Sequence, residues 1–479
     1  MLWLLPTFLL LLELALVVTL ALHLLLRRSG STETRLAWLL LIILLPLVGA
    51  VAYLLLGVRR TSGSVRRHRE IRGSMPGAIN ARSDDLHDIE PEVPRHYQQV
   101  FTIAERLSDT DAMAGHAMEL MGDANSFFDR LVEDIDAATS TIHLLTYIFL
   151  DDSGGNRVVD ALIAAADRGV VCRVLVDAMG SRRFLNSDSC RRLKAANVHV
   201  AEALPTHVWA ILWTRLDIRN HRKIIVIDNS IGWIGSQNMA AASFGLKPRF
   251  APWVDCMVRL RGPAVHNLQE LFLEDWYLGT SERLGELLEA TPQVFESGAT
   301  VQIFGSGPNF RNEVLPMIFQ ASIGAAEEEL IITTPYFVPD MATSAALRAA
   351  ALRGVRTVLV VPARNDSRLV AMASRGHYEA LLEAGVEILE FNGGLLHAKT
   401  MTVDRQLFMV GSANLDRRSL ELNFEVNMLG WDHDFASLLR FLQTSYMDNA
   451  TQVDPEVWAG RSIPARIANS AAGLLSPLL

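Results

Sequence analysis

The sequence predicts an α/β protein in which two tandem α/β/α sandwich domains, related by pseudo-twofold symmetry, follow a two-helix transmembrane hairpin. Three observations support this fold. The chain has 479 residues, which is more than one ordinary domain holds. Two long apolar runs lie at its N-terminus. The order of strand and helix patterns found near residue 140 returns near residue 330, which indicates a duplicated domain.

The two apolar runs have the length and composition of membrane-crossing helices. They cover about residues 3–26 and 36–57, and each could cross a hydrocarbon core of about 30 Å as a helix. A cleaved signal peptide is the alternative for the first run. However, no Lys or Arg precedes Arg27, and a second run follows at once. Residues 1–57 are therefore predicted to form a retained transmembrane hairpin.

Arginine residues around these runs predict the orientation of the hairpin. The loop between the runs holds three arginines, and the segment after the second run holds six. This excess favours a cytoplasmic location for the larger C-terminal portion. The same arginines could bind anionic membrane lipid, or they could serve only as the topology signal. Residues 58–119 are predicted to form a basic juxtamembrane linker and lead-in.

Residues 120–290 and 291–479 are predicted to form two domains with the same order of elements. In the first, a strand at 141–150 precedes an amphipathic helix at 158–169 and a strand at 170–178. The second repeats this order with a strand at 329–340, a helix at 343–354 and a strand at 355–363. The alternation predicts parallel neighbouring strands and a sheet covered by helices on both faces.

Each predicted domain carries the same polar motif. The segments NHRKIIVIDNSIGWIGSQN (220–238) and LHAKTMTVDRQLFMVGSAN (396–414) both read His-x-Lys, four residues, Asp, six residues, Gly-Ser-x-Asn. The chain has only four Lys among 44 basic residues, yet both motifs use Lys at the same place. This choice indicates a site that needs a compact ammonium group. The catalytic candidates are His221, Lys223, Asp228, His397, Lys399 and Asp404.

The paired motifs contain the groups that phosphodiester chemistry requires. A neutral imidazole is a nucleophile, and a neighbouring ammonium group neutralises a non-bridging phosphate oxygen. Displacement at a phosphodiester also needs a general acid on the leaving oxygen at the opposite side. Two half-sites related by a pseudo-twofold axis would place one histidine on each side of a single phosphate. They therefore predict a covalent phosphohistidine intermediate.

Other polar residues are predicted to support this chemistry. The Gly-Ser-x-Asn turns are expected to offer phosphate-binding donors from Ser236, Asn238, Ser412 and Asn414. The motif aspartates have the opposite strand parity from their histidines, so they are expected to brace the motif or its Lys. The residues expected to hold the histidines in one tautomer are Asp255 and Glu425.

Both motifs match the HKD signature of the phospholipase D superfamily, and the whole chain resembles the bacterial cardiolipin synthases of that superfamily. The wider resemblance rests on NHRKIIVIDNSIGWIGSQNM, PWVDCMVRLRGP, TTPYFVP, GSANLDRRSLELNFE and the closing LLSPLL. It implies two phospholipase D-like domains and a multi-pass protein of the bacterial inner membrane. It implies that two phosphatidylglycerols give cardiolipin and glycerol without a nucleotide or cofactor. It also implies that His221 is the nucleophile and His397 the acid/base.

Four other functions were compared with this interpretation. A metal site is disfavoured because a Lys two residues from each His would repel the cation. A nuclease, and any nucleic-acid partner, is disfavoured by the hairpin and by the net charge of −9. A membrane adaptor without catalysis is disfavoured because both motifs are complete. A membrane-bound phospholipase D that hydrolyses headgroups stays the alternative, because the motifs do not specify whether water or a lipid hydroxyl attacks. The sequence leaves the oligomeric state open.

Overall fold

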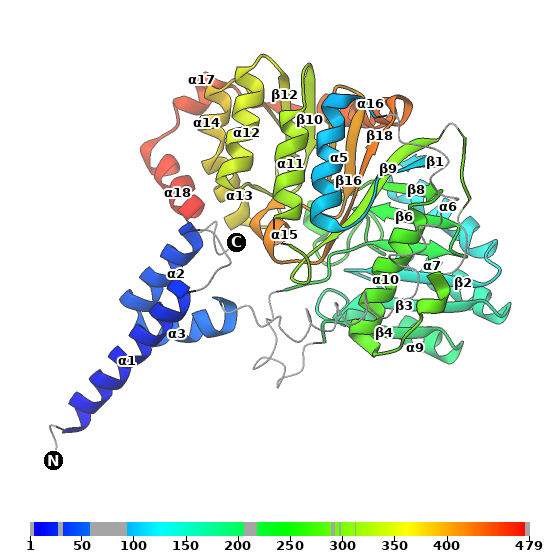
Figure 1. The fold of residues 1–479 in the computed structure, drawn as a ribbon, viewed down its shortest axis with the longest axis horizontal. Coiled ribbons are helices and arrows are strands. Elements are labelled where there is room, and N and C mark those ends of the chain that lie inside the picture. The colour runs from blue at the N-terminus through cyan, green and yellow to red at the C-terminus, as the bar shows by residue number, and fades with distance from the viewer. Residues whose placement is uncertain are drawn as a thin grey trace.

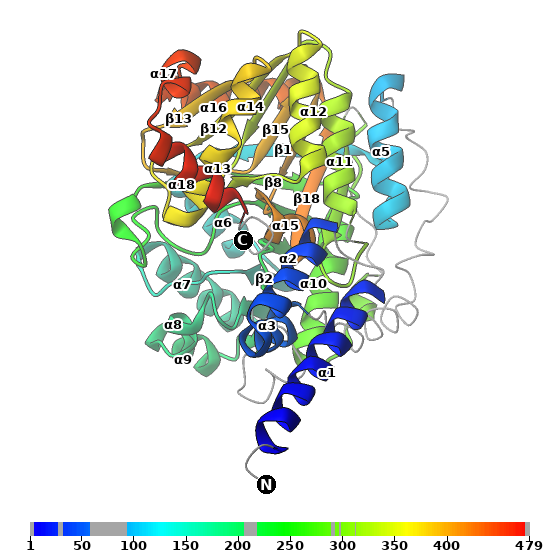
Figure 2. The same cartoon turned by 90° about the vertical axis from the view of Figure 1, so that its left-hand side faces the viewer.

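The computed structural model of the chain describes residues 4–26, 32–57, 93–205, 218–288, 293–296, 298–311 and 313–474. Within these residues, a mixed sheet of 15 strands runs through both halves of the chain. Helices cover this sheet, and the N-terminal helices project from one side of the body (Figures 1 and 2).

The first half of the sheet combines parallel and antiparallel strands. The parallel strands are β2 (Thr141–Thr146), β3 (Val171–Asp177) and β4 (His199–Ala203). The antiparallel strands continue from β2 and are β5 (Ile224–Ile227), β6 (Ile231–Gly235) and β8 (Met257–Arg261). One face packs against α6 (Ala124–Asp136), α7 (Ser153–Asp167) and α9 (Asp188–Ala195), and the other against α10 (Val265–Thr280). The predicted strand–helix–strand order and the covering of both faces are confirmed.

The second half repeats this arrangement. Its parallel strands are β10 (Glu329–Thr333), β12 (Arg356–Pro362) and β13 (Glu387–Phe391), with β19 (Ala450–Gln452) at the edge. Its antiparallel strands are β15 (Thr400–Val403), β16 (Leu407–Gly411) and β18 (Glu425–Trp431). One face packs against α11 (Val314–Gly324), α12 (Met341–Leu352) and α14 (Tyr378–Glu383), and the other against α16 (His433–Asp448). Beside them, α13 (Arg368–Gly376) packs against the C-terminal helix α18 (Ile463–Leu474).

Two central strands join the halves. β9 (Ala299–Ser306) pairs with β18, and β1 (Met113–Met121) lies between β9 and β8. Extended structure therefore begins at Met113, before the boundary expected at residue 120. Helix α5 (Arg95–Ser108) also belongs to the body, because it packs with α11 in the second half (Figure 1).

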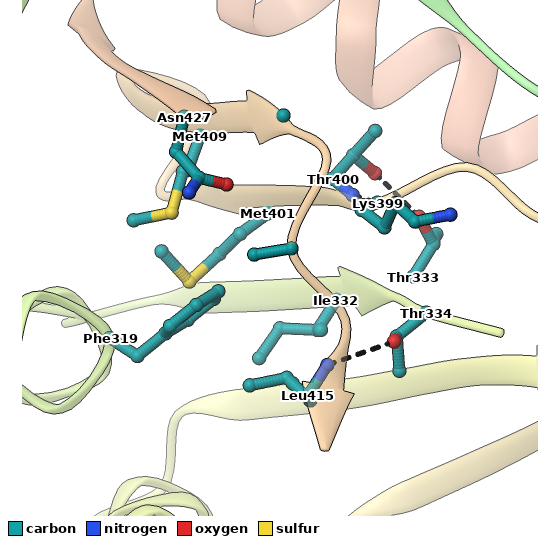
Figure 3. A pocket seen from close by; sticks show the side chains of 12 residues that line it. Phe319, Ile332, Thr333, Thr334, Lys399, Thr400, Met401, Met409, Leu415 and Asn427 are labelled. Atoms are coloured by element: carbon teal, nitrogen blue, oxygen red, sulfur yellow. Dashed lines mark hydrogen bonds between the residues drawn. The ribbon is translucent and has the colours of Figure 1, made fainter. Parts of the chain in front are cut away.

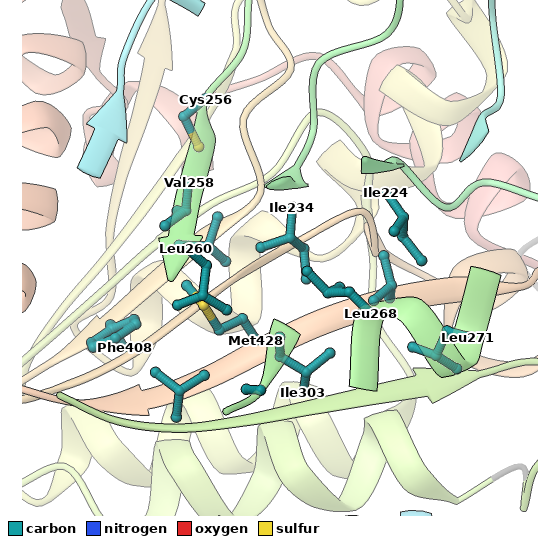
Figure 4. Packing of buried hydrophobic residues seen from close by; sticks show 14 of the residues in the cluster. Ile224, Ile234, Cys256, Val258, Leu260, Leu268, Leu271, Ile303, Phe408 and Met428 are labelled. Atoms are coloured by element: carbon teal, nitrogen blue, oxygen red, sulfur yellow. The ribbon is translucent and has the colours of Figure 1, made fainter. Parts of the chain in front are cut away.

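One apolar core crosses the junction and fixes the halves relative to each other. Figure 4 shows Val258 and Leu268 of the first half close to Ile303, Phe408 and Met428 of the second. These side chains are fully buried. Because the core is shared, the two motif strands are held in one rigid arrangement.

The N-terminal runs form a pair of packed helical segments. The first is α1 (Leu4–Leu26), and the second is divided into α2 (Thr32–Leu44), α3 (Pro46–Ala52) and a π-helical turn (Tyr53–Gly57). The second run is predicted as one helix at 36–57, whereas the structure divides it, because Pro46 lacks the N–H that a continuous helix would use. Leu24, Trp38 and Tyr53 pack the segments together. Among the described helices, none combines the length and hydropathy needed to cross a membrane.

Candidate active site

The two motif histidines lie in short extended segments that lead into β5 and β15. The strand predicted for the first motif begins at Ile224, after His221 and Lys223. The backbone N–H of His221 donates to the carbonyl of Phe424 at 2.8 Å, and that of His397 donates to the carbonyl of Val254 at 2.7 Å. The backbone of each motif is therefore held by the opposite half of the chain.

Each histidine ring also contacts a carboxylate of the opposite half. Nδ1 of His397 lies 2.6 Å from Oδ1 of Asp255, and Nδ1 of His221 lies 3.4 Å from Oε1 of Glu425. The first distance is a short hydrogen bond, while the second pair is in ion-pair range without hydrogen-bond geometry. Asp255 and Glu425, which were expected to orient the histidines, each contact a histidine. Each of them contacts the histidine of the other motif rather than that of its own half.

The motif serines are bonded to these carboxylates. Ser236 donates its hydroxyl to Asp255 at 2.6 Å, and Ser412 donates to Glu425 at 2.5 Å. Each serine oxygen also accepts a backbone N–H, from Cys256 at 3.1 Å and from Val426 at 3.0 Å. Because a hydroxyl has one proton to donate, the serines do not lie in this structure as the phosphate donors that the sequence indicated. They orient the carboxylates instead.

The motif asparagines stabilise the turns that follow the serines. Oδ1 of Asn238 accepts the N–H of Ile148 at 3.1 Å. Nδ2 of Asn414 donates to the hydroxyl of Ser419 at 3.2 Å. Oδ1 of Asn414 is buried and accepts no hydrogen bond from the described residues. The two asparagines are thus equivalent in sequence but differ in their contacts.

Each motif lysine hydrogen-bonds the backbone of the histidine two residues before it. Lys223 donates to the carbonyl of His221 at 2.6 Å, and Lys399 donates to that of His397 at 2.5 Å. Burial lowers the pKa of Lys223 to about 8 and the pKa of Lys399 to about 7, against the opposing effect of Glu425 and Asp255. Both ammonium groups therefore need an anion to keep their charge at higher pH.

Burial also controls the protonation of the histidines. It lowers the pKa of His397 to about 4, although Asp255 favours the imidazolium form. It lowers the pKa of His221 too, against the effect of Glu425. Both imidazoles are therefore neutral near pH 7, which is the form that can attack phosphorus or take up a proton.

The motif aspartates lie at the far ends of β5 and β15, away from the histidines. Asp228 accepts the N–H groups of Thr139, Ser140 and Thr141, each at 2.8 Å. Asp404 accepts the N–H groups of residues 327, 328 and 329 in the same way. Both aspartates adopt a left-handed conformation, with φ of 51° and 50°. Their hydrogen bonds tie the ends of the motif strands to the neighbouring strands β2 and β10.

Three residues near the histidines were not identified from the sequence. The ring of Tyr147 lies 4.1 Å from that of His221, and the ring of Trp253 lies 4.7 Å from that of His397. The side chain of Arg222 is fully buried. It donates to Asp275 at 2.9 Å and to the carbonyl of Glu425 at 3.1 Å. Tyr147 could have been identified from its position directly after a predicted parallel strand. Binding and active sites in sheets with parallel strands form at the carboxyl ends of those strands.

A largely apolar pocket lies behind Lys399 in the second half. Its lining includes Phe319, Met401, Met409 and Asn427. Figure 3 shows the amine of Lys399 pointing away from the two methionine sulfurs. Neither motif histidine lines this pocket, so we do not assign it to the reacting phosphate. In the described part of the chain, no group of three or more His, Cys, Asp and Glu is arranged to hold a metal ion.

Two neutral imidazoles, each paired with a carboxylate and flanked by an ammonium group, define a site for displacement at a phosphodiester. Duplicated α/β halves that carry such a site define the class of phospholipase D-like proteins. The family profile described as "Cardiolipin synthase, PLD-like domain" matches residues 131–276 and 319–441, more than half of the chain. The profile "Phospholipase_D-nuclease N-terminal" matches residues 15–57. The chain therefore belongs to the cardiolipin synthase family of phospholipase D-like proteins.

Individual relatives agree with this assignment. Cardiolipin synthase A of Proteus mirabilis (strain HI4320) is 37% identical over 465 residues, covering 95% of this chain and 94% of that protein. Cardiolipin synthase A of Edwardsiella ictaluri (strain 93-146) is 34% identical over 472 residues, covering 97% and 96%. The crystal structure of phosphatidylserine synthase from Haemophilus influenzae Rd KW20 aligns with a TM-score of 0.60 and 13% identity. That alignment covers 80% of this chain and all of that one, and it supports the fold alone.

Proposed function

We propose that this protein is a membrane-associated bacterial cardiolipin synthase. It transfers the phosphatidyl group of one phosphatidylglycerol to a headgroup hydroxyl of another, and it releases glycerol. The observation that carries the proposal is the crossed pair of histidines, each held by the opposite half. The family assignment selects this reaction among those that such a site can perform.

The first half-reaction forms the covalent intermediate. The imidazole of His221 attacks phosphorus, the new P–N bond forms, and the P–O bond to glycerol breaks. His397 gives a proton to the leaving oxygen, so free glycerol departs. The pKa of His397 is about 4 without substrate, and the bound phosphate anion favours the protonated ring. Lys223 and Lys399 neutralise the non-bridging oxygens.

The second half-reaction reverses these roles with a new alcohol. Neutral His397 takes the proton from a hydroxyl of the second phosphatidylglycerol, and that oxygen attacks phosphorus. The P–O bond forms, the P–N bond breaks, and His221 is released. One phosphodiester replaces another, so the reaction needs no nucleotide.

The two histidines differ in their carboxylate contacts and exposure, and this difference supports His221 as the nucleophile and His397 as the acid/base. The 2.6 Å bond from Asp255 can stabilise a protonated His397 through both half-reactions, as an acid/base requires. His221 lies farther from its carboxylate, at 3.4 Å, and its side chain is more exposed (17% against 7%). A less constrained, more accessible ring suits the nucleophile.

The N-terminal helices are the proposed membrane attachment. Large apolar side chains on them are exposed, including Phe8 (61%), Leu44 (73%) and Leu47 (66%). Such a dense apolar surface is costly in water and matches lipid. We propose that residues 1–57 enter the bilayer as a hairpin, with residues 58–119 as the linker and lead-in. Residues 120–290 and 291–479 are the two phospholipase D-like domains, which lie on the cytoplasmic side.

The test uses purified full-length protein in vesicles of phosphatidylglycerol, with EDTA present and no nucleotide. Mass spectrometry quantifies cardiolipin, phosphatidic acid and glycerol for the wild type, His221→Ala, His397→Ala and the surface control His433→Ala. We expect cardiolipin with matching glycerol, lost by at least about 1,000-fold in both motif variants and retained in the control. Phosphatidic acid in place of cardiolipin would instead establish the hydrolytic alternative. Absence of any turnover would refute the proposal.

A further inference from the structure

The two motif segments are joined to the opposite half of the chain in different ways. The second motif includes a short strand, β14 (Leu395–Leu396), which pairs in parallel with β7 (Trp253–Val254) of the first half. The first motif makes an isolated parallel bridge instead, between Asn220 and Phe424. The backbone pairing that holds the first motif is therefore shorter.

The side chain of Arg222 takes the place of a backbone bond found in the second motif. The equivalent residue of the second His-x-Lys motif is Ala398, whose N–H donates to the carbonyl of Val254, in the opposite half, at 2.9 Å. The N–H of Arg222 bonds within its own segment, to Oδ1 of Asn220 at 3.2 Å. Contact with the opposite half comes from the guanidinium group, whose Nε donates to the carbonyl of Glu425 at 3.1 Å.

This guanidinium group also closes the end of a strand pair. Ser306 and Glu425 are partners where β9 pairs with β18. Nη2 of Arg222 donates to the carbonyl of Ser306 at 3.3 Å, so both carbonyls of the pair accept bonds from one side chain. The group lies 5.4 and 5.5 Å from the ring centres of Phe310 and Phe424. A planar guanidinium with these contacts is held in one orientation.

Asp275 of α10 supplies the opposite charge. Its Oδ2 accepts from Nη1 of Arg222 and from Nδ2 of Asn220, each at 2.9 Å. All three side chains are buried, so the ion pair is shielded from water. Asn220 and Arg222 are the residues directly before and after His221. One buried carboxylate thus holds the backbone on both sides of this histidine.

His221 depends on this support more than His397 does. Nδ1 of His397 lies 2.6 Å from Asp255 in a hydrogen bond, whereas 3.4 Å separates His221 from Glu425 without hydrogen-bond geometry. The place of the His221 ring is therefore set by the segment that carries it and by the end of β18 that carries Glu425. Arg222 binds both of these.

We propose that Arg222 and Asp275 are positioning residues for His221. They hold the first motif against β18, so that the imidazole keeps its place beside Glu425 and in line with phosphorus. This inference rests on the function proposed above, in which His221 is the nucleophile.

The proposal assigns Arg222 and Asp275 to one chemical step. A displaced His221 slows the attack on phosphorus whatever the leaving group is. A fault at His397 slows the reaction only where the leaving oxygen needs a proton. The p-nitrophenolate ion leaves without one, so a comparison of two donor lipids separates the two half-sites.

The test measures single-turnover release of glycerol from phosphatidylglycerol, and of p-nitrophenol from phosphatidyl-p-nitrophenol, in vesicles with enzyme in saturating excess. The rate constant then reports the chemical step, and a smaller folded fraction does not lower it while folded enzyme still saturates the lipid. The test variant is Arg222→Lys, which keeps the charge but not the planar fork. Asp255→Asn serves as the comparison for the other half-site.

The matched control is Arg259→Lys in the same half. Arg259 donates to Asp134 at 2.8 and 2.9 Å, and both side chains are buried. Asp134 also accepts the indole N–H of Trp233 at 3.0 Å, much as Asp275 accepts from a second donor. This ion pair joins β8 to α6, and its bonds do not reach the segment that carries His221.

We expect Arg222→Lys to slow release from both donors by about 10-fold or more, and the control to stay within about threefold of the wild type. Asp255→Asn should slow the release of glycerol alone. Three results would overturn the assignment: an Arg222→Lys rate constant within about threefold of the wild type, a slowing with phosphatidylglycerol only, or an equal slowing in the control.

A second pair of variants serves if Arg222→Lys does not fold. Arg222→Met combined with Asp275→Leu removes both charges, and a buried ion pair replaced by apolar side chains often keeps its stability. The control is then Arg259→Met combined with Asp134→Leu, and the same results decide. A wild type that forms no cardiolipin and releases no glycerol would instead refute the proposed function.

Discussion

At the scale of the residue, the site combines four groups whose protonation is set by burial. Both histidines are neutral near pH 7, and both lysines have a pKa well below the ordinary value. A desolvated ammonium binds an anion more strongly than a hydrated one, because less water must be displaced. The same desolvation makes its charge sensitive to pH in the free enzyme.

The lysine pKa values predict how activity depends on pH. An amine is cationic below its pKa, so Lys399 loses its charge above about pH 7 and Lys223 above about pH 8. We therefore expect kcat/KM for phosphatidylglycerol to fall as pH rises from 7 to 9, because this parameter reports the free enzyme. The fall in kcat should occur at higher pH, because bound phosphate favours the charged amines. Steady-state kinetics on vesicles of constant composition measures both, and a flat kcat/KM profile over this range would contradict the assignment.

The candidate reactive residues of each motif can be proposed from sequence because they are close together along the chain. His-x-Lys spacing alone puts the imidazole and the ammonium group beside each other. It does not predict which carboxylate meets which histidine, because Asp255 and His397 are 142 residues apart and meet only through tertiary packing. The bond from Ser236 to Asp255 also depends on tertiary packing, and it competes with the predicted contact between Ser236 and phosphate.

At the scale of the element, the motif strands depend on the aspartates at their far ends. Asp228 and Asp404 each tie a left-handed turn to three consecutive N–H groups at the start of a neighbouring strand. These bonds set the position of β5 against β2 and of β15 against β10. Strand parity separates the aspartates from the histidines, so this bracing role could be anticipated from sequence.

Replacement of one brace should separate stability from catalysis. Asp228→Asn keeps the shape but loses the charge that strengthens its hydrogen bonds, so we expect a loss of about 2 kcal/mol in stability. Activity at 20 °C, per folded molecule, should stay within about threefold of the wild type. Thermal unfolding in detergent and vesicle assays measure the two effects. The exposed Asp160→Asn is the control, and a 100-fold loss of activity with unchanged unfolding would show that Asp228 is catalytic after all.

The N-terminal elements show the limit of hydropathy as a predictor. Composition correctly identified two helical runs, but it gave the second as one helix. A single residue, Pro46, divides that run because it cannot donate the N–H that continues the helix. One proline thus divides the helix, although the average hydropathy of the run is uniformly high and gives no sign of a break.

At the scale of the whole molecule, the active site exists only where the two halves meet. The pairing β14 (Leu395–Leu396) with β7 (Trp253–Val254) places the second motif on the backbone of the first half. Arg222 makes the reciprocal connection to the carbonyl of Glu425. The duplication of elements was evident from sequence, whereas this exchange of contacts follows from the continuous sheet and the shared core.

The crossed arrangement predicts an effect across the domain boundary. Asp255→Asn in the first half should impair the function of His397 in the second, because an amide cannot stabilise its imidazolium form. We expect at least about a 100-fold loss in kcat. Glu425→Gln should cost less, since Glu425 lies 3.4 Å from His221 without hydrogen-bond geometry. Single-turnover release of glycerol measures the first half-reaction for both variants, and an Asp255→Asn enzyme with more than a tenth of wild-type kcat would argue against the crossed assignment.

The exchange of carboxylates between the halves has a genetic consequence. Although the motif is present twice, one copy cannot replace the other. The histidine of each motif needs a carboxylate that only the other half provides. A null mutation in one motif should therefore be a null mutation of the gene. Two alleles with different damaged motifs, expressed in one cell, should fail to complement, since the intact motif of each chain is joined covalently to a broken one.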